Sequence, residues 1–240
     1  KVNGYFSDLL SLYVEDKGHK SSVADTASTY LAELNSIYPS KQSSLFFSMF
    51  KSIEIIMHMS QYDYESTIDI CKEAIVFLEQ RVFKRASLLA FIYAQLSDCL
   101  LQVGRYDEAH HYCKELIKKY TVEGEFNWFK MQELQLHILL HMEQYQEAYD
   151  VFQLTTKHTN FVKLPSAFLE EWNISRAYLE FLSLNFLVRT DQDHQKHPFR
   201  LNKFLNEVPT FSKDKTGLNV AIILCQIQIL IVQKKYNKVS

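Results

Sequence analysis

Two histidines separated by four residues are the first candidates for chemistry in this sequence. On a helix, His137 and His141 lie one turn apart on the same face, where both imidazoles could bind one metal ion. A third ligand would have to come from elsewhere, and Glu133 or the pair His110 and His111 are the available groups. Histidine pairs at this spacing are common, and the simpler interpretation is that they are polar residues on the inner surface of a stack of helices. We therefore predict neither a metal site nor a cofactor.

Two adjacent carboxylates are the second candidate. Glu170 and Glu171 precede Trp172, but acid–base work by two carboxylates needs them opposed across a cleft, whereas neighbours on a helix point about 100° apart. We expect a solvated face beside a buried tryptophan. GxGxxG, P-loop, GxSxG and HExxH patterns are absent from the sequence, and its 5 glycines are too scattered to build a phosphate-binding loop. We predict that the chain is not an enzyme; a strongly perturbed carboxylate or histidine in a closed pocket would favour the opposite.

Composition indicates the elements that must position these residues. Glycine and proline number only 5 and 4 among 240 residues, whereas apolar residues make up 47%. Sandwiches, barrels and dinucleotide-binding folds need many turns rich in glycine and proline, so long helices joined by short turns are favoured. The 26 basic and 28 acidic residues give a formal net charge of −2 without a Lys/Arg block. Because phosphate binding normally leaves a basic footprint, we predict no nucleic-acid partner.

Cysteine usage and hydropathy bear on the location of the protein. The four cysteines lie inside apolar-periodic segments and form no CxxC pair, which predicts buried free thiols in a reducing cytoplasm: Cys71, Cys99, Cys113 and Cys225. The uncharged segment Thr216–Gln233 contains several amide side chains, and a spanning helix needs about 20 mostly apolar residues. We therefore predict a cytoplasmic protein without a membrane segment.

Apolar residues recur with helical periodicity along almost the whole chain. A capping box formed by Ser22 and Asp25 is expected to begin the second helix, and the polar segment 190–198 is the expected loop. The predicted helices cover residues 4–14, 22–37, 41–60, 64–78, 84–103, 106–120, 127–142, 145–158, 165–188, 199–208 and 217–235.

An internal repeat is the most informative feature of the sequence. Three junctions between helices share one pattern, at residues 61–66 (QYDYES), 104–109 (GRYDEA) and 143–148 (EQYQEA), and a fourth begins at residues 234–239. Their marker residues Tyr64, Tyr106, Tyr145 and Tyr236 are separated by 42, 39 and 91 residues. Since 91 residues are about two periods, one degenerate repeat should lie between the last two, with its turn near Asp191.

The clearest repeat, residues 93–116, resembles the tetratricopeptide-repeat superfamily. The positions that match the family pattern are Tyr93, Leu96, Ser97, Gly104, Tyr106 and Ala109. The unit at 132–155 keeps Tyr145, Ala148 and Phe152 but has Leu136 where a small residue is usual, and the preceding unit keeps Tyr64, Cys71 and Ala74. The resemblance implies an all-α fold, a right-handed α-solenoid of about five long antiparallel helix hairpins. It implies a single domain over residues 1–240, clearest over 41–157, with a period longer than the family's usual 34 residues.

The resemblance also implies a binding surface, because the first helix of each pair lines the concave face in this superfamily. The residues placed there are Gln95, Asp98 and Gln102 from one helix, and Lys130, Glu133, His137 and His141 from another. Such hydrogen-bonding and titratable groups are suited to an extended peptide or a partner helix. The alternative is that they are only the solvated side of their helices. The Asn/Lys/Arg set that captures a C-terminal carboxylate in some chaperone-binding relatives is not reproduced.

The predicted function is therefore a protein–protein or protein–peptide interaction scaffold that binds through the concave face. A peptide-sensing regulatory domain whose effector module lies outside this chain is the alternative. The apolar helix at 217–235 lacks the second helix of its pair, so we expect either that more chain follows or that this helix pairs with another copy in a homodimer.

Overall fold

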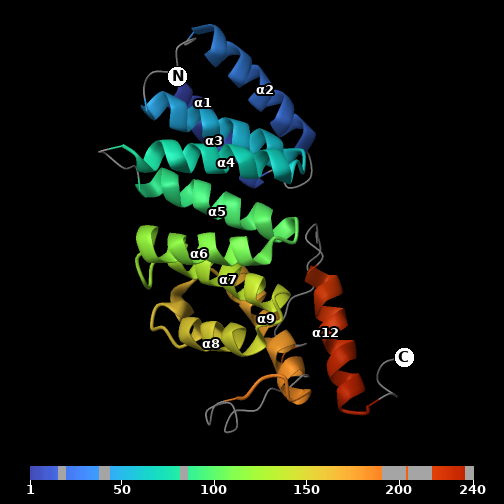
Figure 1. The fold of residues 1–240 in the computed structure, drawn as a ribbon. Coiled ribbons are helices and arrows are strands. Elements are labelled where there is room, and N and C mark those ends of the chain that lie inside the picture. The colour runs from blue at the N-terminus through green and yellow to red at the C-terminus, as the bar shows by residue number, and fades with distance from the viewer. Residues whose placement is uncertain (16–19, 38–43, 82–85, 191–203, 205–217, 236–240) are drawn as a thin grey trace. The chain divides into compact units, whose positions relative to one another are not determined.

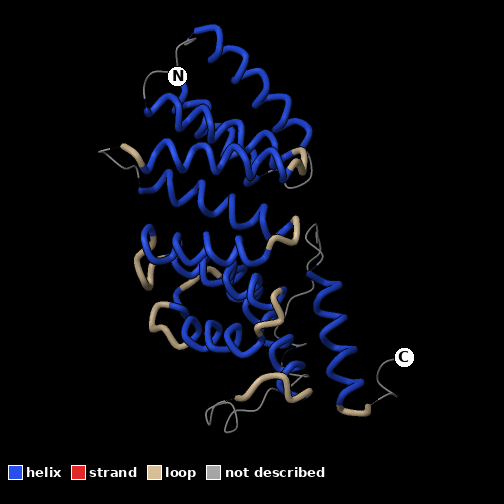
Figure 2. Tube along the Cα trace, viewed as in Figure 1, coloured by secondary structure: helices blue, strands red, loops and turns tan. Residues whose placement is uncertain are grey.

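The structure is a computed structural model that describes residues 1–15, 20–37, 44–81, 86–190, 204 and 218–235. The described residues form ten α-helices and one 3-10 helix, without a strand. The all-α prediction is confirmed, and Figure 2 shows the described residues as helices and loops. The chain divides into two compact units, residues 1–122 and 123–240, and each is described by itself.

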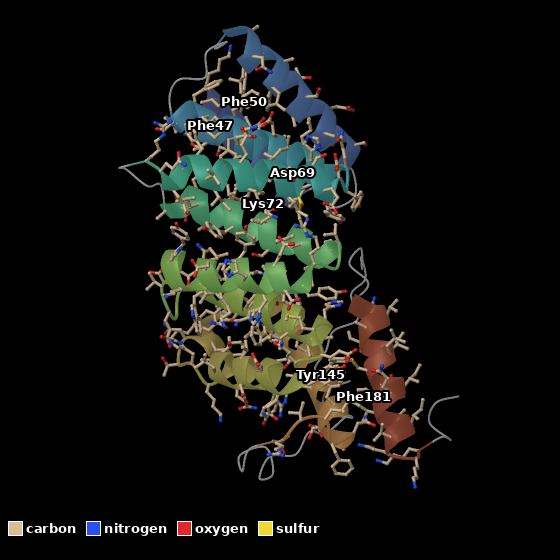
Figure 3. All side chains as sticks on the ribbon, viewed as in Figure 1. Phe47, Phe50, Asp69, Lys72, Tyr145 and Phe181 are labelled. Atoms are coloured by element: carbon tan, nitrogen blue, oxygen red, sulfur yellow. The ribbon has the colours of Figure 1, made fainter. Side chains whose placement is uncertain are left out.

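The first unit contains six helices, each packed on the next along the chain (Figure 1). They are α1 (Val2–Glu15), α2 (Lys20–Ile37), α3 (Ser44–Ser60), α4 (Tyr64–Glu79), α5 (Ala86–Gln102) and α6 (Tyr106–Tyr120). Helix α3 contacts α1, α2 and α4, which explains why its apolar residues cover a wide face. Phe50 of α3, labelled in Figure 3, is 1% exposed and belongs to the core formed with α1 and α2. Burying a side chain of this size contributes about 1.5–3 kcal/mol.

The second unit contains α7 (Phe126–His141), α8 (Tyr145–Thr156), the 3-10 helix η1 (Phe161–Lys163), α9 (Ser166–Leu184) and α12 (Leu218–Val232). Helix α8 packs on α7 and on α9, and α12 packs on α9. The other side of α12 exposes apolar side chains at helical spacing: Val220, Ile223, Leu224 and Ile231. That this helix pairs with a second copy stays a prediction.

Most predicted helices agree with the structure to within a few residues, and two local predictions are wrong. Helix α2 begins at Lys20, so Ser22 lies in its first turn, where its carbonyl accepts from the Thr26 hydroxyl at 2.8 Å, and it is not the cap. Helix α9 ends at Leu184 and not at 188. The predicted helix at 199–208, apart from Phe204, and the predicted loop after Thr190 lie outside the described residues, as does Tyr236.

A single type of turn ends five of the described helices. Tyr62, Gly104, Glu143, Phe186 and Lys234 all have positive φ, between 57° and 78°. In each turn this residue's N–H donates to the carbonyl three residues back, and the next N–H donates to the carbonyl five residues before itself, at 2.9–3.2 Å. These paired bonds define a Schellman motif. The turns follow one another at 42, 39, 43 and 48 residues, so a turn of this type lies at Phe186, between those at Glu143 and Lys234, five residues before the predicted position, which itself is outside the described residues.

Burial repeats with the same register as the turns. Helices α4, α6 and α8 begin at Tyr64, Tyr106 and Tyr145, each two residues after a left-handed residue. Three residues further on, a small side chain is fully buried in every case: Thr67, Ala109 and Ala148, each 0% exposed. A small residue lets neighbouring helices approach closely, so the repeat in the sequence corresponds to a repeat in packing.

The left-handed turn residues give a testable prediction about stability. Only Gly adopts this conformation without a steric cost, yet Glu143 occupies it with φ 59°. We expect Glu143→Gly to raise the free energy of unfolding by about 0.5–1 kcal/mol. Gly104→Ala, whose new Cβ would meet nothing nearer than 3.9 Å, should lower it by about 1 kcal/mol through φ alone. Urea denaturation measures both; a loss of stability in Glu143→Gly would contradict the assignment of this turn.

Candidate functional site

One face of α7 carries the four residues predicted from this helix. Lys130, Glu133, His137 and His141 are spaced by three, four and four residues, which places them along one stripe. Glu133 is buried at 8% exposure, Lys130 is half-buried, and both histidines are exposed. One end of the stripe, at Lys130 and Glu133, is therefore charged and largely buried, and the other end, at His137 and His141, is exposed to solvent.

At the buried end, a lysine connects two carboxylates. The Nζ atom of Lys130 lies 3.1 Å from Glu133 Oε2 and 3.8 Å from Glu171 Oε2 on α9. The same ammonium group lies 4.5 Å from the centre of the Phe168 ring, also on α9. Ion pair and cation–π contact together hold the lysine between the two helices.

Burial makes Glu133 an unusual acid. It raises the pKa of Glu133 to about 7; Lys130 opposes this rise, while the charge of Glu171 and a hydrogen bond with it add to the rise. Two carboxyl groups in contact cannot both ionise at low cost. Contact with Glu171 therefore favours the protonated form of Glu133, whose carboxyl can donate a hydrogen bond to Glu171.

A pocket of about 210 Å³ lies at the open end of the stripe. It is lined by His137, Leu140 and His141 from α7 and by Tyr178 from α9. His137 is exposed at the mouth of the pocket. The protein atoms around its ring nevertheless lower the pKa of His137, and the charge of Glu171 opposes this change. Burial raises the pKa of Tyr178, so its hydroxyl remains a neutral hydrogen-bonding group. The charge of Tyr145 adds to the rise in the pKa of Tyr178. The ring centre of Phe181 lies 6.2 Å from that of Tyr178. Figure 3 labels Tyr145 and Phe181.

An aromatic cluster holds α9 in place beneath the site. Trp172 is 2% exposed, and its ring centre lies 5.7 Å from that of Phe152, 5.5 Å from that of Phe161 and 6.2 Å from that of Phe168. These rings come from α8, η1 and α9. Because interiors of this density resist shifts of even one methylene, the cluster fixes the register at which α9 presents Glu171.

The predicted residues on α5 form a separate group in the first unit. Gln102 Nε2 donates to Asp98 Oδ1 at 3.4 Å, on the exposed side of the helix. Burial raises the pKa of Tyr13 of α1 to about 12, and the Asp98 carboxylate adds to this rise. Burial and the Asp98 carboxylate also raise the pKa of Tyr64 at the start of α4. Gln95 is half-buried on the same helix. This group borders a tyrosine cluster, and we assign no pocket to it.

Three residues of the site were missed in the sequence. Glu171 was expected on a solvated face, whereas it contacts the ion pair on α7, and Phe168 and Tyr178 were not singled out. All three lie on one side of α9 at a spacing of three and seven residues. That periodicity was available in the sequence, but the orientation of α9 toward α7 was not.

In the part of the chain that the structure describes, no three His, Cys, Asp or Glu side chains gather as a metal ion would require. Among the same residues, no helix combines the length and hydropathy that crossing a membrane demands. Comparison with protein families, with curated proteins and with solved structures finds no match to this chain. Function must therefore be inferred from the side chains themselves, above all those between α7 and α9.

Proposed function

We propose that this chain is a divergent tetratricopeptide-like domain that binds a protein or peptide segment through the surface between α7 and α9. In this proposal the helices form a right-handed α-solenoid of antiparallel hairpins. The recurring Schellman turn and the recurring burial of Thr67, Ala109 and Ala148 support a repeat of helix pairs. Helices α7 and α9 would then be the first helices of consecutive pairs, which face the same side of an array.

The observation that carries the proposal is the pocket shared by α7 and α9. Apolar walls with a few convergent polar groups are typical of a binding site, and Leu140 lines this pocket together with His137, His141 and Tyr178. Its volume of about 210 Å³ suits one side chain of a partner and is small for a whole cofactor. A peptide or protein segment is therefore the ligand that it fits best.

The proposal can be tested by selecting peptides from a random display library on the immobilised full chain. We expect the enriched peptides to lose about tenfold or more in affinity for the double variant His137→Ser/Tyr178→Ala, because truncating the walls of a central pocket removes the contacts that carry most binding energy. Leu154→Ala, an exposed position of α8, is the matched control and should change affinity less than twofold. Equal affinity for the pocket variant, or no enriched peptide, would contradict the proposal.

The two other hypotheses from the sequence make different demands. A peptide sensor should be stabilised by one specific peptide and should pass a conformational change to an effector, whereas a scaffold should bind without such a change. The raised pKa of Glu133 is a feature that favours an enzyme. However, Glu133 is buried and does not line the pocket, so a substrate in the pocket would meet imidazole and phenol groups and not this acid.

A further inference from the structure

The pocket and the carboxyl pair lie a short distance apart along α7. Each helical residue advances the chain by about 1.5 Å, so Glu133 lies about 9 Å from the mean level of His137, Leu140 and His141. An extended peptide advances about 3.3 Å per residue, so two to three residues cover this distance. One short extended segment can therefore contact both features.

The two features differ in the side chain that they would accept. Helix α7 lines the pocket with the aliphatic side chain of Leu140 and the imidazoles of His137 and His141, and α9 lines it with the Tyr178 ring. A bulky apolar or aromatic side chain fits these walls and is small enough for the volume of about 210 Å³. Burial of this ligand side chain would stabilise the complex and would bring no charge into the pocket.

The carboxyl pair would instead accept a cation. Lys130 compensates one negative charge, at 3.1 Å from Glu133 and 3.8 Å from Glu171, and protonation of Glu133, whose pKa burial raises, compensates the other. Glu171 remains partly accessible, with 40% of its side chain exposed. A guanidinium or ammonium group can bind the exposed Glu171 carboxylate in place of the proton donated by Glu133, and guanidinium does so with two parallel hydrogen bonds.

We propose that the surface between α7 and α9 recognises an extended segment in which a basic residue stands two or three positions from a bulky apolar or aromatic residue. The basic side chain contacts the exposed carboxylate of Glu171, and the apolar side chain fills the pocket between His137 and Tyr178. This inference rests on the proposed function and narrows it to one ligand chemistry.

Binding of this kind releases a proton, so affinity should rise with pH. The titrating group is Glu133, and a proton on His137 at low pH would add positive charge and act in the same direction. The other titratable groups beside the surface between α7 and α9 do not reverse this rise of affinity with pH. Burial raises the pKa of Tyr178, and it raises the pKa of Cys225 on α12 to about 11. The charges of Tyr145, the first residue of α8, and of Glu143, in the turn before it, both add to the rise in the pKa of Tyr178.

The test uses four short peptides and the full chain. The probes are Ac-Phe-Gly-Arg-NH2 and Ac-Arg-Gly-Phe-NH2, with matched controls in which citrulline, the neutral isostere of arginine, replaces arginine. Titrations followed by NMR on the histidine ring protons, at pH 5.5 and pH 8, give the dissociation constants. At pH 8 we expect at least one arginine peptide to bind about tenfold more tightly than its citrulline control. At pH 5.5 the difference should fall to about twofold.

Two variants separate the carboxyl pair from the pocket. Glu171→Gln should remove the preference for arginine while the citrulline peptides bind as before, and Glu133→Gln should remove the pH dependence of that preference. Glu170→Gln, the neighbouring position on α9, should keep the preference. Equal binding of the arginine and citrulline peptides at pH 8 would overturn this inference and leave the proposed function standing. If none of the four peptides shifts the ring signals of His137 and His141, this inference is overturned, whereas the proposed function is overturned only if the random library also yields no binding peptide.

Discussion

Replacing Trp172 with alanine is expected to lower the free energy of unfolding of the second unit by about 3–5 kcal/mol. The indole is 2% exposed and contacts rings from α8, η1 and α9, so its removal leaves a cavity that three elements would have to fill. Urea denaturation followed by tryptophan fluorescence is the measurement. The remaining tryptophan, Trp128, is buried in the same unit and reports on it alone.

Two further variants make this result interpretable. Trp172→Phe should cost about 1–2 kcal/mol, because it keeps most of the ring and also removes an indole N–H that is buried without a hydrogen-bond partner. Leu154→Ala, exposed on α8, should cost less than about 0.5 kcal/mol. A loss below about 1 kcal/mol in Trp172→Ala would show that the aromatic cluster does not hold α9.

Replacing Glu133 with glutamine is expected to stabilise the protein at pH 8 by about 1–3 kcal/mol and to have little effect at pH 5. The folded state raises the pKa of Glu133 to about 7. The stability from the protonated carboxyl is therefore complete below the ordinary pKa of a glutamate and is lost as the pH rises through 7. Glutamine reproduces the protonated form, since its amide can donate to Glu171 and its carbonyl can accept from Lys130.

The measurement is urea denaturation of both proteins at pH 5 and pH 8. Glu170→Gln is the matched control, because it changes a carboxylate on α9 next to Glu171 without touching the buried pair, and it should behave alike at both pH values. An equal stability difference between Glu133→Gln and the parent at pH 5 and pH 8 would mean that Glu133 does not retain its proton on folding.

Much of the fold follows from local sequence signals. Helix α6 was predicted at 106–120 and has these bounds, because Gly104 permits the left-handed turn before it and Ala109 permits close packing after it. The turn at Phe186 was harder to predict, since a large aromatic residue stands where glycine is usual and no tyrosine follows. The period of about 42 residues, counted from Glu143, would have placed it within a residue of Phe186.

The candidate site was predictable on one helix only. The spacing of Lys130, Glu133, His137 and His141 defines a stripe on α7 through helical periodicity alone. Whether that stripe contacts solvent or another helix depends on the rotation of α9, which the packing around Trp172 sets. For that reason the contact with Glu171 and the pocket with Tyr178 emerged only in three dimensions.

The most direct measurement of the central claim is a cross-linking map of the binding face. A pool of randomised octapeptides carrying a benzophenone group is irradiated with the full chain, and the modified residues are located by mass spectrometry. If α7 and α9 form the binding surface, the cross-links should concentrate at residues 130–141 and 168–178, and free peptides selected for binding should suppress them. Cross-links spread evenly along the chain, or concentrated on the exposed apolar face of α12, would contradict the claim.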